Sequence, residues 1–408
     1  MLDLGTETRA MTGTSVDISH SRWSRWRTPV LAWGLSRILV IGLAILAEYW
    51  LGQTGYGTDP SVPRPLALLG SWDTSWYIDI ARHGYDHYTG LVGVVYTNLA
   101  FFPLLPMVMW VGIRTSTNPF IWGFVASNLA FFGAVLGMHR LSWDRGGLAF
   151  ANRATWVFAF APPAVYASMA YTDGLLVALA IGAALAATRG RWYLAGIASA
   201  LAALARPPGI LIAVLVVLIA VSANGVPWAM RARHALIGAV PAVVALGGFL
   251  TWMQVARGSW HLPLDAQGAW QRGSLGIGLV TGLPKATSSA LGYLAPPFPD
   301  GLFDNLTWTG GERDFLFTIL MAFLVVALWR REGGWRSPWV LFTILALGIP
   351  LMSGSYGSMT RFGLVAFPLV WPVTDWLLRG GRARQSWLIG ATLAVTVLLV
   401  MQLHVTSP

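Results

Sequence analysis

The chain has 408 residues, of which 55% are hydrophobic and only 11% are charged. This balance excludes an ordinary soluble domain and indicates a protein that crosses a membrane several times. The formal net charge of +10 comes almost wholly from arginine, and such an excess in a membrane protein marks cytoplasmic loops, so no nucleic-acid partner is expected. Because the sequence contains no cysteine, disulfides, thiolate metal sites and cysteine nucleophiles are also excluded.

The N-terminal residues 1–28 are polar and basic, and we expect a disordered cytosolic tail. Residues 29–408 are expected to form a single integral membrane domain. Its first span is predicted over about 30–51, and Arg22, Arg25 and Arg27 would hold the start of this span in the cytoplasm.

A large external loop is predicted next, over about 52–118, with short juxtamembrane helices. Its apolar segment 101–113 contains Pro103 and Pro106. Since proline costs a helix interior about 3 kcal/mol and the segment is short, we predict that it lies at the interface or re-enters the membrane.

The remaining spans are predicted from apolar runs separated by arginine clusters, over 119–138, 154–171, 174–188, 192–205, 210–222, 235–256, 315–329, 338–352, 361–378 and 387–404. This register gives about eleven spans, a cytoplasmic N-terminus and a second large external segment over about 257–312. Every arginine cluster then falls inside, whereas a full crossing at 101–113 would place the clusters outside, against the positive-inside rule. We therefore predict an all-α polytopic protein of the plasma membrane.

The densest group of ionisable and aromatic side chains begins at Trp72, in the first external loop. Asp73 is the expected catalytic residue, because a sugar or lipid hydroxyl needs a base to become a nucleophile. The rings of Trp72, Trp76 and Tyr77 can stack on the face of a sugar. The other interpretation is that Asp73 caps the short helix 74–82, and the two roles are compatible.

The same stretch contains Asp79, with Arg82 and His83 three and four residues later. This spacing places the three side chains on one helix face and favours a structural ion pair. Arg82 and His83 are also candidates for substrate contact.

Further candidates for substrate binding fall at predicted external ends of spans: Tyr171, Asp173, Arg206, His261, Tyr356 and Arg361. Arg206 and Arg361 could together clamp a phosphate, or each could extend to lipid headgroups. Asp173 could contact substrate or, like Thr172, cap the helix 174–188. His261 and Asp265 are four residues apart, which suits a hydrogen-bonded pair better than a metal site.

The chemistry is narrowed by missing motifs, since the sequence has neither a P-loop nor a GxGxxG fingerprint after a strand. An external active site has no supply of nucleotide sugars, so an activated donor would be tethered to the membrane by a lipid phosphate. No cofactor is expected, and a divalent cation is left open.

The order of several motifs resembles the PIG-V-type mannosyltransferases, that is, the GPI second mannosyltransferases and their relatives. The most specific block runs from Trp72 to Tyr85 and continues with Ala100-Phe101-Phe102-Pro103-Leu104-Leu105-Pro106. Weaker matches follow in the same order, at Ser127-Asn128-Leu129, Tyr171-Thr172-Asp173, Ala205-Arg206-Pro207-Pro208-Gly209 and Thr360-Arg361-Phe362. The chain departs from the family where Asp173 replaces the commoner glutamate and Pro208 a small polar residue.

This resemblance implies a GT-C-type glycosyltransferase fold. It also implies an inverting transfer of a sugar, with mannose expected, from a polyprenyl-phosphate donor to a glycolipid, glycan or protein acceptor. Asp73 would be the general base on the extracytoplasmic face. Two other functions stay open from the residues alone: a transporter or flippase of a lipid-linked glycan, and a membrane scaffold that uses its large external loop as a partner surface.

Overall fold

The fold is known from a computed structural model that describes residues 22–51, 58–86, 96–270, 277–294 and 310–404. All regular structure within these ranges is helical, and they contain no strand. This finding confirms the predicted all-α architecture. The predicted tail 1–28 lies mostly outside the described residues, but helix α1 already begins at Arg22, so the boundary placed at residue 28 was too late.

Several helices have the length and hydropathy of membrane spans. Four of the described helices qualify directly, namely α1 (Arg22–Trp50, over Trp26–Trp50), α4 (Pro119–Ala159), α8 (Trp228–Arg257) and α15 (Arg382–Leu403). A fifth candidate is a pair bent by 110°, which joins η3 (Pro162–Ser168) to α5 (Asp173–Thr188). By length and composition the chain is therefore a multi-pass membrane protein, while the number of about eleven spans stays a prediction.

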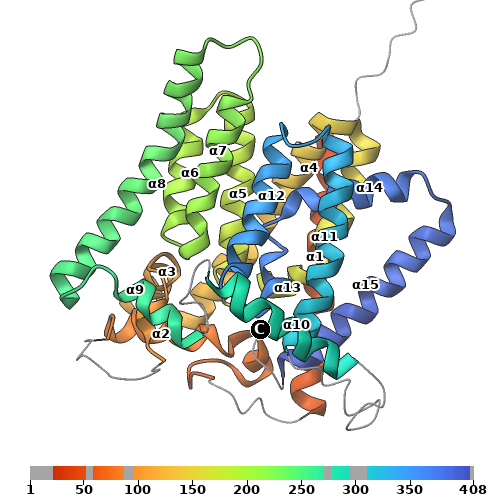
Figure 1. Ribbon diagram of the computed structural model, residues 1–408. Coiled ribbons are helices and arrows are strands. Elements are labelled where there is room, and N and C mark those ends of the chain that lie inside the picture. The colour runs from red at the N-terminus through yellow and green to blue at the C-terminus, as the bar shows by residue number, and fades with distance from the viewer. Residues whose placement is uncertain (1–21, 52–57, 87–95, 271–276, 295–309, 405–408) are drawn as a thin grey trace, which may run out of the picture.

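Further helices run beside these spans and complete the bundle (Figure 1). They are α6 (Trp192–Ala203), α7 (Leu211–Val221), α11 (Gly310–Glu332), α12 (Pro338–Leu351) and α14 (Val370–Leu378). Fully buried alanines such as Ala134, Ala180 and Ala184 fill the interior. Small side chains let neighbouring helix backbones approach closely, which is how helices associate within a lipid bilayer.

Helix α4 is a hairpin rather than one continuous rod. Gly147 has non-helical dihedral angles (φ 74°, ψ −174°) and breaks the helix. The two halves lie side by side, since the rings of Phe131 and Phe158 are 5.4 Å apart and His139 Nε2 is 3.1 Å from the Asn152 side-chain oxygen. Both halves of α4 therefore extend into the interval 139–153 that separates the two predicted spans, and the chain turns at one glycine. The predicted span 154–171 is also wrong in its second half, since Pro162 begins η3.

A layer of short elements gathers at the lower end of the bundle in Figure 1. It contains η1 (Arg64–Gly70), α2 (Asp73–His83), η2 (Asn98–Ala100), α3 (Leu104–Arg114), η4 (Pro207–Ile210), α9 (Leu262–Asp265), η5 (Ala266–Trp270), α10 (Ile277–Leu294) and α13 (Met359–Phe362). The turn η7 (Phe367–Leu369) lies instead against the first turns of α12, where the Phe367 ring contacts those of Trp339 and Phe342. At 1.5 Å per residue, the 11 residues of α3 span about 16 Å, too little to cross the bilayer core. The predicted segment 361–378 is likewise divided, into α13, η7 and α14.

One buried cation ties the first helix to η3. Arg37 of α1 is 4% exposed and donates to the Ala164 carbonyl at 3.0 Å and to Ser168 Oγ at 2.5 Å. Both acceptors belong to η3, whose irregular backbone leaves groups that a regular helix would pair internally. Arg37 therefore fixes the segment that leads into α5.

Candidate active site

Four charged side chains from four separate elements meet at the lower end of the bundle, and we name Asp73, Asp173, Arg206 and Arg361 the acid–arginine cluster. Arg361 Nη1 donates to Asp73 Oδ2 at 2.5 Å, and Arg361 Nε donates to Asp173 Oδ2 at 2.7 Å. Arg206 Nη1 donates to Asp173 Oδ1 at 2.8 Å. The formal charges of the four groups cancel, which is how buried ionic groups are usually accommodated.

The backbone brings both carboxylates to helix N-termini. Asp73 is the first residue of α2 and Asp173 is the first residue of α5. The partial positive charge at a helix N-terminus favours a carboxylate there. Neither helix has a side-chain capping hydrogen bond, however, so the capping interpretation of both aspartates is wrong. Their side chains turn to arginine instead.

Backbone strain accompanies two of these positions. Trp72, directly before Asp73, has φ 56°, and Ser358, at the start of α13, has φ 64°. Non-glycine residues seldom adopt positive φ, and such strain clusters at functional sites. Arg206 itself is extended and is followed by Pro207, so the chain leaves α6 and presents the guanidinium to Asp173.

The two carboxylates differ in access. The Asp173 side chain is 1% exposed, and each of its oxygens accepts from an arginine. The Asp73 side chain is 17% exposed, and its Oδ1 accepts no hydrogen bond from any described residue. Asp173 therefore serves to hold the two arginines, while Asp73 keeps one oxygen available.

Aromatic rings cover the buried arginines. The Arg361 guanidinium carbon lies 4.4 Å from the centre of the Tyr171 ring, and that of Arg206 lies 5.0 Å from the Phe362 ring. Cation–π contacts of this kind stabilise a desolvated guanidinium. Lipid-headgroup contact, the alternative expected for both arginines, does not fit their burial of at least nine-tenths.

A further carboxylate, Asp314 near the start of α11, is part of the support for Arg361. It is 1% exposed and accepts from the Thr360 backbone N–H at 3.0 Å and from the Thr360 hydroxyl. Sequence reasoning missed this residue, although Glu312-Arg313-Asp314 places three ionisable residues directly before an apolar run. That pattern is the signal that could have revealed it.

The aromatic residues around Asp73 have different surroundings. Trp72 Nε1 donates to the Leu403 carbonyl at 3.2 Å, so this ring packs toward α15. Trp76 stacks on Phe101 with ring centres 5.9 Å apart. The Tyr77 hydroxyl lies 3.4 Å from Thr172 Oγ1, and burial, together with the nearby Asp73 carboxylate, raises the pKa of Tyr77 to about 12. Tyr77 is therefore a neutral phenol beside the cluster.

The other predicted site residues lie outside the cluster. Arg82 pairs with Asp59 at 2.6 Å, so the expected Asp79–Arg82 pair is wrong, whereas the expected pair of Asp79 with His83 forms at 2.8 Å.

In the segment that the sequence predicts to be the second external one, His261 contacts Asp265. The Tyr356 hydroxyl lies 2.7 Å from Thr287 Oγ1 of α10, and the Tyr171 hydroxyl donates to the Ser71 carbonyl at 3.3 Å. Across the described ranges, no group of three histidine or acidic residues is placed to hold a metal ion.

The family model described as Mannosyltransferase (PIG-V) matches residues 56–224. A search of curated proteins gives no match.

Among solved structures, the chain is similar to the oligosaccharyltransferase AglB from Archaeoglobus fulgidus in complex with an inhibitory peptide and a dolichol-phosphate. The TM-score is 0.49 at 14% identity, and the match covers 94% of this chain and 56% of that protein, so the chain spans little more than half its length.

The family match includes Asp73, Asp173 and Arg206, while Arg361 lies beyond it. It supports glycosyltransferase activity. The motifs that begin at Trp72 predict the same resemblance independently. Residues 56–224 thus carry the pattern of the PIG-V mannosyltransferase family, and the predicted resemblance is confirmed over that part of the chain.

Proposed function

We propose that the protein is a GT-C-type glycosyltransferase that moves a sugar, expected to be mannose, from a polyprenyl-phosphate donor to a hydroxyl acceptor at the external face of the membrane. The observation that carries this proposal is a partly exposed carboxylate, Asp73, that is paired with a buried arginine through only one of its two oxygens. Asp73 keeps Oδ1 free of described donors, and Arg361 fixes Oδ2. A carboxylate with one oxygen fixed and the other available is a suitable candidate for a general base, which supports the proposal.

In the proposed reaction, the acceptor hydroxyl loses its proton to Asp73 Oδ1. The acceptor oxygen then forms a bond to the anomeric carbon, while the bond from that carbon to the phosphate oxygen breaks and its electron pair leaves with the polyprenyl phosphate. One displacement inverts the anomeric carbon. A phosphate is a good leaving group, so no second carboxylate is needed as an acid.

The charges of the acid–arginine cluster support this sequence of events. Before the reaction two carboxylates balance two guanidinium groups. Protonation of Asp73 leaves Arg206 and Arg361 facing Asp173 alone, so the site gains one positive charge. The departing phosphate gains one negative charge in the same step. Preorganised charge of this kind is usually the largest contribution to catalysis.

Substrate positions follow from the side chains near Asp73. Trp76 is half-buried and stacked on Phe101, which suits it to lie against a sugar ring. Roles in substrate binding for Trp72, Tyr77, Arg82, His83, Tyr171, His261 and Tyr356 stay predictions. The acceptor is proposed to be a glycolipid, a glycan or a protein.

The test is an Asp73→Asn variant assayed with labelled polyprenyl-phosphate mannose in membranes that contain the protein. We expect sugar transfer to fall by about 10²–10⁴-fold, since asparagine cannot accept the proton. Asp144→Asn is the control, because it removes an exposed carboxylate that pairs with Arg140 and Arg189 near the other end of the bundle. This control should keep its activity.

Both variants are first compared by size-exclusion chromatography and thermal unfolding, so that loss of fold is not read as loss of chemistry. Unchanged transfer by a folded Asp73→Asn protein would remove the proposed mechanism. Movement of the labelled donor across the membrane without any product would favour a flippase.

A further inference from the structure

A second site lies at the opposite end of the bundle from the acid–arginine cluster. A cavity of about 410 Å³ opens between the turn before α6 and the first turns of α8. Asp173 begins α5, and this turn follows the end of the same helix. Because α5 has 16 residues, about 24 Å separate the two sites along its axis. The cavity therefore does not belong to the acid–arginine cluster.

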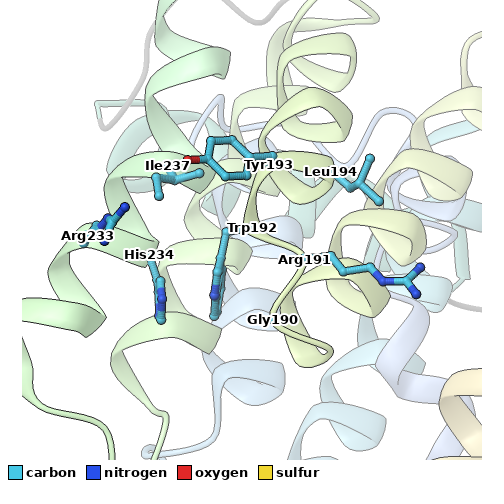
Figure 2. A pocket seen from close by; sticks show the side chains of 8 residues that line it. All are labelled: Gly190, Arg191, Trp192, Tyr193, Leu194, Arg233, His234 and Ile237. Carbon is cyan, nitrogen blue, oxygen red and sulfur yellow. The ribbon is translucent and has the colours of Figure 1, made fainter.

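The lining of the cavity is basic and contains no carboxylate. Arg191 and Arg233 both line it, together with the ring of His234. Neither arginine forms an ion pair within the part of the chain that the structure describes. Trp192 and His234 stack with ring centres 4.6 Å apart and planes 12° from parallel. Figure 2 shows the two arginines on either side of this stack. Such a surface is complementary to an anion.

Apolar side chains continue from the cavity along the outside of the bundle. Tyr193 and Leu194, in the first turn of α6, are 71% and 52% exposed, and Ile197 one turn later is 55% exposed. On α8, Leu236 and Val240 are also exposed, and they lie one turn apart close to the residues that line the cavity. A basic cavity is thus joined to a lipid-facing surface. Aromatic side chains such as Trp192 are typical of this boundary between water and lipid.

We propose that this cavity binds the phosphate-bearing headgroup of an anionic phospholipid, with the acyl chains along the exposed faces of α6 and α8. Arg233, beside His234, would contact the phosphate, the Trp192–His234 stack would contact the glycerol, and Arg191 on the far side of the stack would add positive charge at the rim of the cavity. Basic pockets between membrane helices bind anionic headgroups in this manner. A soluble phosphate would use the same arginines but not the apolar surface.

The competing explanation is that the two arginines only mark the cytoplasmic side, as arginines at span ends usually do. Arg330 and Arg379 provide the matched comparison. Both are exposed arginines at the ends of α11 and α14, on the same end of the bundle, and neither lines the cavity. If only the positive charge mattered, removing Arg330 and Arg379 would lower the affinity for an anionic lipid as much as removing Arg191 and Arg233.

The experiment is native mass spectrometry of the full chain, released from detergent after incubation with dioleoyl phosphatidylglycerol or dioleoyl phosphatidylcholine. We expect the protein to retain phosphatidylglycerol preferentially. The Arg191→Gln/Arg233→Gln variant should lose about tenfold in affinity for this lipid, and the Arg330→Gln/Arg379→Gln variant should lose little. The Arg191→Lys/Arg233→Lys variant retains the charge, and it should keep most of the preference.

Three outcomes would overturn the proposal. The first is equal retention of the two lipids, and the second is an equal loss in the two glutamine variants. In the third, glycerol phosphate added to the protein competes with phosphatidylglycerol at similar concentration, which would make the ligand a soluble anion. Melting temperatures of the variants without added lipid separate a folding defect from lost binding. None of these measurements depends on sugar transfer.

Discussion

Asp73 and Asp173 begin their helices in the same way and contact the same arginine, yet their surroundings assign them different tasks. Asp173 is nearly inaccessible and has both oxygens engaged by arginine. Its removal would leave Arg206 and the inner side of Arg361 without a counter-charge. An uncompensated buried charge is among the few single changes that destabilise a protein strongly.

We therefore predict that Asp173→Asn lowers the free energy of unfolding by about 3–5 kcal/mol. Asp73→Asn should cost less, because its carboxylate is partly exposed and Arg361 keeps Asp173 as a partner. Thermal unfolding of the purified proteins in detergent compares the two. A smaller loss for Asp173→Asn than for Asp73→Asn would contradict the assignment of Asp173 as the structural carboxylate.

At this scale the sequence identified all members of the acid–arginine cluster as candidates but not their pairing. Asp73 and Asp173 each stand at the start of a predicted helix, which is the usual place of a cap, and only the tertiary contact with Arg361 distinguishes an ion pair from a cap. Asp314 was missed because its partner, Thr360, lies 46 residues away, and local patterns contain no information on such contacts.

At the scale of elements, the short turn η4 determines where Arg206 lies. Gly209 passes so close to the end of α6 that a Cβ there would lie 1.7 Å from the Ala202 carbonyl oxygen. The Gly209 N–H also donates to the Arg206 carbonyl at 2.8 Å. Since the obstructing atoms are backbone, any larger residue must displace the turn that presents Arg206 to Asp173.

We predict that Gly209→Ala destabilises the protein by about 1–3 kcal/mol, as overpacking does elsewhere, and lowers sugar transfer as well. Gly182→Ala is the matched control, because a Cβ at Gly182, within α5, would meet nothing within 4 Å. Thermal unfolding and the transfer assay report on both variants. Equal behaviour of the two would show that η4 does not position Arg206.

The sequence predicted that the elements are helices better than it predicted where each helix begins and ends. Apolar runs and flanking arginines predicted most helices, since lipid leaves few alternatives to a helix. The reversal of the chain between 119–138 and 154–171 was predicted, but its position at Gly147 was not, because both halves of α4 continue as helix through the arginine-containing residues between the two predicted spans. The 11 residues of α3 agree with the short segment predicted at Pro103 and Pro106, while its place relative to the membrane stays a prediction.

At the scale of the molecule, the acid–arginine cluster and the basic cavity lie at opposite ends of one bundle (Figure 1). The predicted orientation places the cluster outside and the cavity inside. Because the chain contains no cysteine, each end can be labelled through a single introduced thiol without background. Ser116, in the turn after α3, and Asn224, in the turn before α8, are both exposed.

We predict that in intact cells Ser116→Cys reacts with a membrane-impermeant maleimide, whereas Asn224→Cys reacts only after the cells are permeabilised. Gel shift of the labelled protein is the measurement. The reverse pattern would place Asp73 in the cytoplasm and contradict the external reaction, while the helix packing would be unaffected.

Asp73 and its partner Arg361 are separated by 288 residues of sequence, and this separation affects the order of events during synthesis. A ribosome adding about 5–20 residues per second needs roughly 15–60 s to cover that distance. During this interval the aspartate of a nascent chain already stands at the membrane without its counter-ion, and Arg206 and Asp173 have only each other. If Asp73 acts as proposed, the site is complete only once Arg361, within the last quarter of the chain, has been inserted, and a product truncated before Arg361 is expected to be inactive.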